Sequence, residues 1–281
     1  MELPDEERFN LERRTYDCLP TLTDNQVLDF CQQGFLVLEG VVPDEINRRT
    51  YAYLEENTYF EPAEILKEDW FVDNVILNPQ AAGAIRSLLG KNFGLPVMMS
   101  QHRVKCPMSD QGWHRDAGSK WGPELNYLQV FYYPQDTSEA FGPTEVLPGS
   151  HLFNASARYM SHYGNIRGAV KTTAPAGSIF ITVYSIWHRR SASTAEGMRH
   201  MLKYNYWRTV PPERDWIIEP DFDFESADYG PNRFQSAHMF YWLCGRKDEF
   251  RWIGGQGWPL RYGRGPNYRP YGAPSAPPGD W

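Results

Sequence analysis

Cysteine is scarce in this chain of 281 residues, which has four cysteines and no CxxC pair among them. Zinc-finger spacing and a dense disulfide framework are therefore excluded as the basis of the fold, and a reduced, intracellular chain is expected. The opening segment 1–14 is acidic and polar, where a secretory leader needs an apolar run. These features together predict a cytoplasmic protein.

Long apolar runs and basic runs are also missing. No stretch approaches the roughly 18 consecutive apolar residues of a membrane-spanning helix, and no run of five basic residues occurs. The formal net charge is −7, whereas nucleic acids and anionic membranes select for basic surfaces. We therefore expect neither a nucleic acid nor a membrane as partner, but a small molecule.

The first third of the chain predicts helices with one strand among them. Thr23 and Gln26 match a capping box, and Gly34 is suited to end the helix that they start. The apolar run 35–38 that follows is typical of a buried strand. Two further helices are predicted, from Pro43 to about residue 57 and from Asn78-Pro79 to Gly90.

From about residue 95, short β-rich runs alternate with Gly, Pro and Asp turns, which is typical of a sandwich or barrel. Helices first and strands later predict a single domain over 1–281 that is mainly β with helical cover. The aromatic residues of 254–281 favour packing on the domain or on a second copy, so a homodimer is one alternative. We expect strands at 97–104, 128–133, 144–147, 178–187 and 199–207, with a helical cover over 1–94, a jelly-roll core over 95–210 and an irregular segment rich in aromatics, Pro and Gly over 211–281.

His114 and Asp116 form an HxD pair that could bind a metal. In an extended segment residues i and i+2 point to the same side, so both side chains can reach one ion. A third ligand could be His188, and two imidazoles with one carboxylate on one face of iron form the facial triad of non-haem Fe(II) oxygenases. Arg199 would add a forked donor for a carboxylate near that metal. An isolated HxD is usually a surface turn, so the prediction depends on the combination.

The segments around these residues resemble the phytanoyl-CoA dioxygenase-like (PhyH) family of Fe(II)/2-oxoglutarate oxygenases. The resemblance begins at Leu22-Thr23-Asp24, continues through GPTEVLPGSH at 142–151, and ends at Arg199 and Tyr204. It implies a double-stranded β-helix, the cupin-like jelly roll, with Fe(II), 2-oxoglutarate and O₂ as cofactors. It also implies iron ligands at His114, Asp116 and His188, and a 2-oxoglutarate carboxylate at Arg199.

Two features of the chain bear on how the cosubstrate is held. Strands through 178–188 and 199–207, joined by a turn at 194–197, would be neighbours and bring Arg199 close to His188. The family usually has Gly, Ser and Asn shortly after the distal histidine, whereas this chain reads RRSAS at 189–193. The hydroxyl partner of the cosubstrate is therefore left open between Ser191 and Ser193.

Four further residues are candidates for the lining of the site. By resemblance to related enzymes Gln101 is a contact to cosubstrate or substrate, with a purely structural role as the alternative. Trp121 is a candidate for the pocket wall because it follows Asp116 closely. Phe131 and Tyr133 share one face of the strand 128–133 with Gln129, and the sequence does not tell which face lines the site.

The predicted activity is the 2-oxoglutarate-dependent oxidation of a small organic molecule, with release of succinate and CO₂. Hydroxylation is favoured because Asp116 keeps the carboxylate that halogenating relatives lack, while desaturation and ring formation stay open. A non-catalytic binding or sensor protein is the alternative of another class, and the intact triad argues against it. A zinc hydrolase is a third, for which no dedicated general base is evident. The substrate stays unassigned; acidity and abundant aromatics favour a neutral or cationic molecule over an acyl-CoA.

Overall fold

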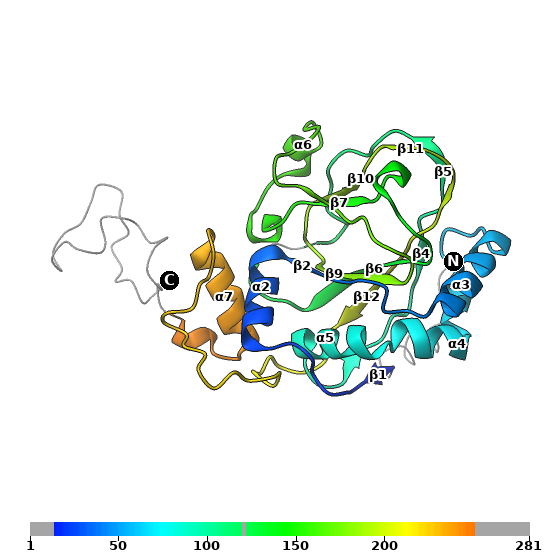
Figure 1. The fold of residues 1–281 in the computed structure, drawn as a ribbon. Helices are drawn as coiled ribbons and strands as arrows, with labels where there is room; N and C mark the ends of the chain where they lie inside the picture. The colour runs from blue at the N-terminus through cyan, green and yellow to red at the C-terminus, as the bar shows by residue number, and fades with distance from the viewer. Residues whose placement is uncertain (1–13, 120–121, 251–281) are drawn as a thin grey trace.

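The computed structural model describes residues 14–119 and 122–250. A seven-stranded antiparallel sheet, with the order β1-β3-β12-β6-β9-β2 and β4 beside β12, faces two smaller sheets, β10-β7-β8 and β11-β5 (Figure 1). This is the predicted double-stranded β-helix, so the fold class is confirmed. The strands are β1 (Thr15–Tyr16), β2 (Phe35–Leu38), β3 (Phe93–Gly94), β4 (Ser100–Gln101), β5 (Val104–Met108), β6 (Tyr127–Tyr133), β7 (Thr144–Val146), β8 (Val170–Lys171), β9 (Ser178–Val183), β10 (His188–Arg190), β11 (Ser193–Arg199) and β12 (Leu202–Trp207).

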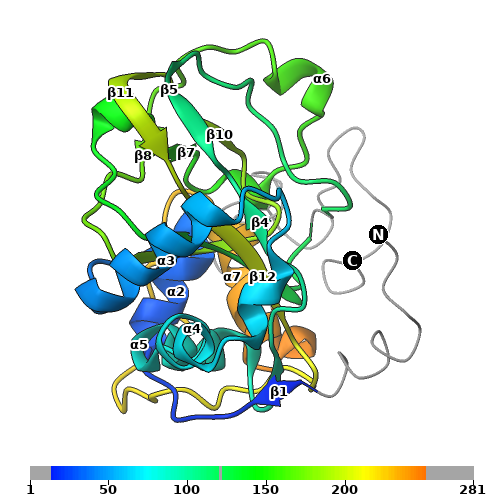
Figure 2. The same ribbon diagram turned by 90° about the vertical axis from the view of Figure 1, so that its right-hand side faces the viewer.

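Helices cover the face of the large sheet that is turned away from the two smaller sheets (Figure 2). None of the helices within the described ranges has the length and apolar character needed to cross a membrane. The helices are α2 (Asp24–Gln33), α3 (Asp44–Glu56), α4 (Asp69–Phe71), α5 (Pro79–Leu89), α6 (Ala157–Met160) and α7 (Arg233–Leu243), with short turns η1 (Ala63–Lys67), η2 (Val72–Ile76), η3 (Glu139–Phe141), η4 (Ser150–Leu152) and η5 (Lys247–Glu249).

Helix α2 leads directly into strand β2, and the ends of this helix form as predicted. Thr23 and Gln26 complete the capping box, and Gly34 ends the helix in the left-handed conformation at φ +79°. A Cβ at residue 34 would collide with the ring of His151, so glycine is needed there for space as well as for φ. His151 is fully buried and its Nε2 bonds to the carbonyl of Cys31. This contact ties the GPTEVLPGSH segment to the end of α2.

The strands of the large sheet separate two environments by simple alternation. On β6, Leu128, Val130 and Tyr132 pack into the main hydrophobic core with the helices. Their neighbours Phe131 and Tyr133 face the smaller sheets, where they cluster with Phe180 and Met201. The structure thus answers which face of this strand is turned to the interior of the jelly roll.

Several predicted boundaries need correction. The run 97–104 is not one strand but parts of β4 and β5, and 178–187 ends as a strand at Val183. The run 199–207 is divided between β11, which pairs with β5, and β12, which pairs with β6. The predicted turn at 194–197 is itself part of β11. Here the chain crosses from one sheet layer to the other, a change of partner that local β-propensity does not encode.

The segment 211–281 was predicted to be irregular. Its described part contains the helix α7, most of which is buried. This helix packs against α2, and Phe240 within it contacts the rings of Trp216 and Phe222. Its polar and apolar residues show no clear helical stripe, since seven of its eleven residues are buried and the other four are half-buried. The predicted packing of 254–281 lies outside the described residues.

Candidate active site

The two histidines of the predicted triad face each other across a short antiparallel bridge. The backbone N–H of each donates to the carbonyl of the other, His114 to His188 and the reverse, both at 3.0 Å. Their ring centroids lie 4.5 Å apart. Asp116 completes the group: one ligand atom from each of the three residues lies within 4.8 Å of the others. The structure therefore brings His188 to the remote pair His114 and Asp116 in an arrangement that could hold a single metal ion.

Backbone carbonyls orient both imidazoles. Nδ1 of His114 lies 2.9 Å from the carbonyl of Gly112, and Nδ1 of His188 lies 3.0 Å from that of Ile186. Because a carbonyl can only accept, each Nδ1 carries the proton and each Nε2 keeps its lone pair free. Metal-bound histidines are commonly held by such a bond from the second ring nitrogen.

Charge in the site favours an ionised carboxylate and neutral imidazole. Lys203 Nζ donates to Asp116 Oδ2 at 2.9 Å. Burial alone would raise the pKa of Asp116, but electrostatic interactions with His188 and with the Lys203 ammonium outweigh it and hold that pKa below its usual value. Burial lowers the pKa of His188 to about 4, against the opposing effect of Asp116. Both shifts favour the protonation states that bind a cation.

The backs of the two histidine segments are held by aromatic contacts with arginines. An arginine next to each histidine stacks on the tryptophan next to the other histidine. Arg189 lies 4.9 Å from the ring centroid of Trp113, and Arg115 lies 5.0 Å from that of Trp187. Both tryptophans are buried. These cation–π pairs lie on the opposite face from the imidazoles and fix the register of the bridge.

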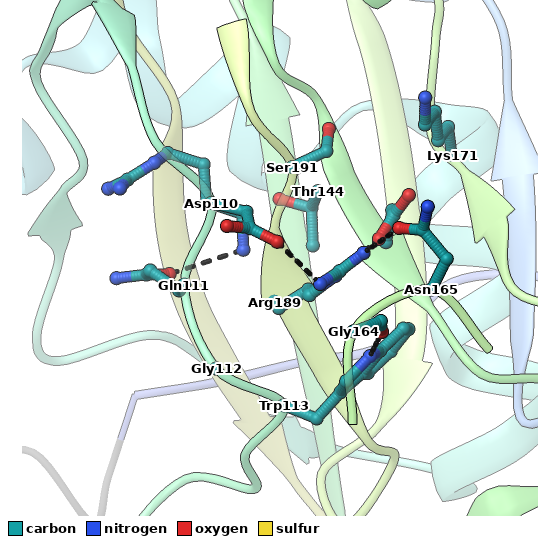
Figure 3. A network of polar contacts seen from close by, with 12 residues as sticks. Asp110, Gln111, Gly112, Trp113, Thr144, Gly164, Asn165, Lys171, Arg189 and Ser191 are labelled. Carbon is teal, nitrogen blue, oxygen red and sulfur yellow. Dashed lines mark hydrogen bonds and ion pairs between the residues drawn. The ribbon is translucent and has the colours of Figure 1, made fainter. Parts of the chain in front are cut away.

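Arg189 is also the centre of a polar network (Figure 3). Its guanidinium donates to the carboxylates of Glu145 and Asp110 and to the side-chain oxygen of Asn165. Each of the three guanidinium nitrogens thus donates one of these bonds, and the side chain is only 3% exposed. Arg189 is therefore structural and not free to bind a ligand phosphate.

Arg199 lies in a small cavity that is also lined by His114 and His188. Its side chain is 1% exposed and forms no ion pair among the described residues. Nη2 makes a long contact of 3.4 Å to Thr144 Oγ1, and Nε has no partner. A buried guanidinium without an anion is costly, so this cavity suits a carboxylate ligand.

The route by which Arg199 reaches the site differs from the prediction. Strands β9 and β12 are not neighbours, because β6 lies between them. Arg199 instead ends β11, at the crossing between the two sheet layers, and therefore faces the interior beside β7 and β10.

The predicted hydroxyl partners are engaged elsewhere. Ser191 Oγ donates to the carbonyl of Pro143 at 2.6 Å, and Ser193 Oγ accepts from the N–H of Met108 at 2.8 Å. Neither serine lines the cavity around Arg199, whereas Thr144 does. Thr144 was not among the predicted site residues, although its position within the GPTEVLPGSH segment was a signal.

The remaining predicted site residues fall in three places. Gln101 is turned toward α3, where its amide contacts the carbonyl of Leu54 and the ring of His200, away from the cavity. Phe131 lines the cavity, 5.8 Å from the His188 ring, and Tyr133 lies under the Arg199 guanidinium at 5.6 Å. Trp121 lies outside the described residues.

Lys203 was also missed by the sequence analysis, although its position offered a signal. Alternation within the predicted strand 199–207 puts residue 203 on the same face as Arg199. The crossing at residues 200–201 keeps this relation, since Arg199, Met201 and Lys203 all line the same cavity.

A second, larger cavity of about 790 Å³ begins at Ala117 and Gly118, directly after Asp116 in the chain. Met98, Tyr127 and Trp207 contribute apolar and aromatic surface, and Glu124 contributes the one charged side chain among its described lining residues. Cavities of about 300–1,000 Å³ are typical of sites for small organic ligands.

Comparison with known proteins places the chain in a family. The sequence profile described as phytanoyl-CoA dioxygenase (PhyH) matches residues 30–201, which is more than half of the 281 residues. The chain belongs to the phytanoyl-CoA dioxygenase family. Membership confirms the predicted class, a non-haem iron oxygenase that uses Fe(II), 2-oxoglutarate and O₂.

Solved structures share the fold at low sequence identity. HygX from Streptomyces hygroscopicus, with nickel and 2-oxoglutarate bound, is 18% identical with a TM-score of 0.55, over 70% of this chain and 90% of HygX. A nickel complex of the non-haem monooxygenase ThoJ is 19% identical with a TM-score of 0.52, over 79% and 96%. The carbocyclase SnoK from nogalamycin biosynthesis is 17% identical with a TM-score of 0.53, over 67% and 87%. No curated protein sequence matches the chain.

Proposed function

We propose that this protein is an Fe(II)- and 2-oxoglutarate-dependent oxygenase that hydroxylates an uncharged or cationic small organic molecule. His114, Asp116 and His188 hold the metal, and Arg199 binds the distal carboxylate of the cosubstrate. The observation that carries the proposal is the convergence of three ligand atoms within 4.8 Å in a cavity that also holds a buried guanidinium without an anion.

The residues present fit the metal and the cosubstrate. Both Nε2 atoms are directed by Nδ1 hydrogen bonds to backbone carbonyls, and Lys203 holds one oxygen of Asp116 at 2.9 Å while the other lies 3.7 Å from His188 Nε2. Fe(II), when bound with 2-oxoglutarate and O₂, supplies the oxidising power to replace a substrate hydrogen by a hydroxyl, with succinate and CO₂ as coproducts. The chain itself supplies ligand orientation, charge and a shielded cavity.

We assign the substrate to the 790 Å³ cavity beside Asp116. Asn205 lines it, and its Oδ1 is buried without a partner. Opposite Asn205 on β6 lies Gln129, which is 0% exposed and whose two amide atoms are both unpaired. Unpaired buried amides are unfavourable unless a ligand completes their hydrogen bonds. We therefore expect a substrate with an aromatic or apolar body and a polar group directed at these amides.

An acyl-CoA is disfavoured as substrate. Its phosphates need basic side chains, yet the described lining of the larger cavity holds Glu124 as its charged residue. Arg189 is occupied by Glu145 and Asp110. The family name is therefore not evidence for an acyl-CoA substrate here.

Hydroxylation is the reaction that we propose, because Asp116 occupies the position that a halide would need. The fold neighbours include a monooxygenase, an epimerase and a carbocyclase, so a shared fold does not fix the outcome. The orientation of the substrate hydrogen in the larger cavity would decide between these outcomes.

Succinate release in the presence of candidate substrates tests the proposal. The purified protein with Fe(II), 2-oxoglutarate and O₂ would be given neutral hydroxylated polycycles, aromatic amines and acyl-CoAs, and succinate and hydroxylated product would be quantified. We expect stimulation by a member of the first two groups. Stimulation by acyl-CoAs alone would overturn the substrate class, and a protein that binds candidates without oxidising any would favour the sensor alternative.

A further inference from the structure

Arg190 occupies the place where this chain departs from the usual family sequence after the distal histidine. On β10, His188 and Arg190 are two residues apart and therefore share one face. Arg190 is paired with Thr144 of β7, and directly opposed residues of an antiparallel pair also share a face. Arg190, Thr144 and Arg199 accordingly line the same small cavity.

Two of the three arginines that line this cavity, Arg190 and Arg199, have unused hydrogen-bonding capacity. Arg190 donates from Nη2 to the carbonyl of Ser109 at 2.8 Å, while its buried Nε has no partner. The Nε of Arg199 is likewise buried and unpaired. Neither guanidinium forms an ion pair within residues 14–119 and 122–250, in contrast to Arg189 beside them.

Two guanidiniums that line one small cavity repel each other unless an anion lies between them. A carboxylate has two oxygens with four lone-pair positions, enough to accept from two arginine forks at once. Thr144 Oγ1, which already contacts Arg199, adds a hydroxyl that the engaged serines Ser191 and Ser193 do not supply. Arg189 and Lys203, which also line the cavity, are already paired with carboxylates. Arg190, Arg199 and Thr144 thus offer two guanidiniums without an ion pair and one hydroxyl to a single carboxylate.

We propose that Arg190 and Arg199 form a two-arginine clamp for the distal carboxylate of 2-oxoglutarate, with Thr144 as the hydroxyl partner. This rests on the proposed function and adds a second charged contact to it. The clamp would make the protein strongly selective for 2-oxo acids with a second carboxylate, because a monoanionic 2-oxo acid leaves both arginines unpaired.

Equilibrium binding tests the clamp without turnover. Under anaerobic conditions the Fe(II) protein would be titrated with 2-oxoglutarate, and with 2-oxobutanoate, which lacks the distal carboxylate, while the weak visible charge-transfer band of the chelate is followed. We expect Arg190→Gln to raise the Kd for 2-oxoglutarate at least about tenfold and to change that for 2-oxobutanoate less than about twofold. Arg190→Lys, which keeps the charge but not the fork, should lie between.

Arg167→Gln, an exposed arginine outside the cavity, is the matched control and should leave both Kd values unchanged. The clamp is refuted if Arg190→Gln binds 2-oxoglutarate like the parent, or if it weakens both 2-oxo acids equally, which would indicate a structural role. Should Arg190→Gln fail to fold, Arg190→Lys decides: an unchanged Kd for 2-oxoglutarate overturns the clamp, and a selective rise supports it. A parent protein that gives no band at all would refute the proposed function instead.

Discussion

The two faces of the large sheet are built from alternate residues of the same strands, yet they differ in composition: the helical face is mainly apolar, and the other face carries buried amides. On the helical face, Leu128 and Val130 of β6 and Tyr206 of β12 are fully buried and packed. On the face toward the smaller sheets, Gln129 and Asn205 are left with unpaired amide atoms. Neighbouring residues on a strand point to opposite faces. A residue that stabilises the core can therefore be next in the chain to one that we propose to contact the substrate.

The largest expected effect is at the metal ligands, which lie outside the large sheet, on β10 and on the segment that bridges to it. Asp116→Ala or His188→Ala should reduce conversion of 2-oxoglutarate to succinate to the no-enzyme background, because two ligands do not hold the metal in a defined geometry. The thermal midpoint without metal should change little beyond the loss of the Lys203 contact. Near-normal turnover in both variants would remove the assignment of the triad.

A substitution in the helical face should lower stability strongly and leave the binding of 2-oxoglutarate unchanged. Leu128→Ala deletes a fully buried side chain from the main core and should lower the free energy of unfolding by about 2–5 kcal/mol. The Kd for 2-oxoglutarate should stay within about twofold of the parent value at a temperature where the variant is folded. Urea unfolding measures the first quantity and anaerobic titration the second. A variant that loses cosubstrate binding while folded would contradict the separation of the two faces.

Arg199 should affect the cosubstrate chiefly. Arg199→Ala is expected to raise the KM for 2-oxoglutarate about ten- to a hundredfold, since a charged hydrogen bond contributes about 1.5–3 kcal/mol. The effect on kcat should be smaller, because the contact is to a part of the cosubstrate that does not react. Steady-state kinetics with Arg199→Lys as the charge-preserving control measure this split. An unchanged KM would show that the cosubstrate carboxylate lies elsewhere.

Gln129→Leu should change the free energy of unfolding in the opposite direction to Leu128→Ala, although the two residues are neighbours in the chain. Removing an unpaired buried amide relieves a desolvation cost of about 1–3 kcal/mol, so the free energy of unfolding should stay equal or rise. Substrate-stimulated succinate release should fall at the same time, while 2-oxoglutarate binding is retained. Destabilisation comparable to that of Leu128→Ala would mean that Gln129 is a satisfied core residue.

The smallest expected effect concerns acid stability at His151, which lies outside both faces. Burial lowers the pKa of His151 from 6.5 to about 4, although the Cys31 carbonyl opposes the shift. The unfolded chain therefore binds a proton that the folded chain excludes, so stability is lost as the pH falls from 6.5 toward 4. In His151→Gln the urea midpoint should fall less steeply over this range. The exposed His162→Gln serves as control, and an unchanged slope in His151→Gln would contradict this origin.

Much of the fold and the central site could be predicted because their signals are local. The capping box at Thr23 and the glycine at 34 reproduce the bounds of α2, and the HxD spacing places His114 and Asp116 on one side of an extended segment. The remote partner His188 was a candidate from the combination of residues, and the family resemblance supported it, because spacing alone does not give it.

The missed features depend on tertiary structure. The run at 199–207 has continuous strand propensity, yet the chain changes sheets at His200 and Met201. The hydroxyls of Ser191 and Ser193 were plausible partners by proximity in sequence, but backbone groups of Pro143 and Met108 engage them. Sequence spacing does not show which hydroxyl is already bonded.

Anomalous diffraction at the iron edge, from crystals grown anaerobically with Fe(II) and 2-oxoglutarate, tests the metal centre most directly. We predict one iron peak per chain, coordinated by His114 Nε2, His188 Nε2 and an oxygen of Asp116, with the distal carboxylate of 2-oxoglutarate at Arg199. Iron bound at another place, or no ordered iron beside these three side chains, would contradict the central claim.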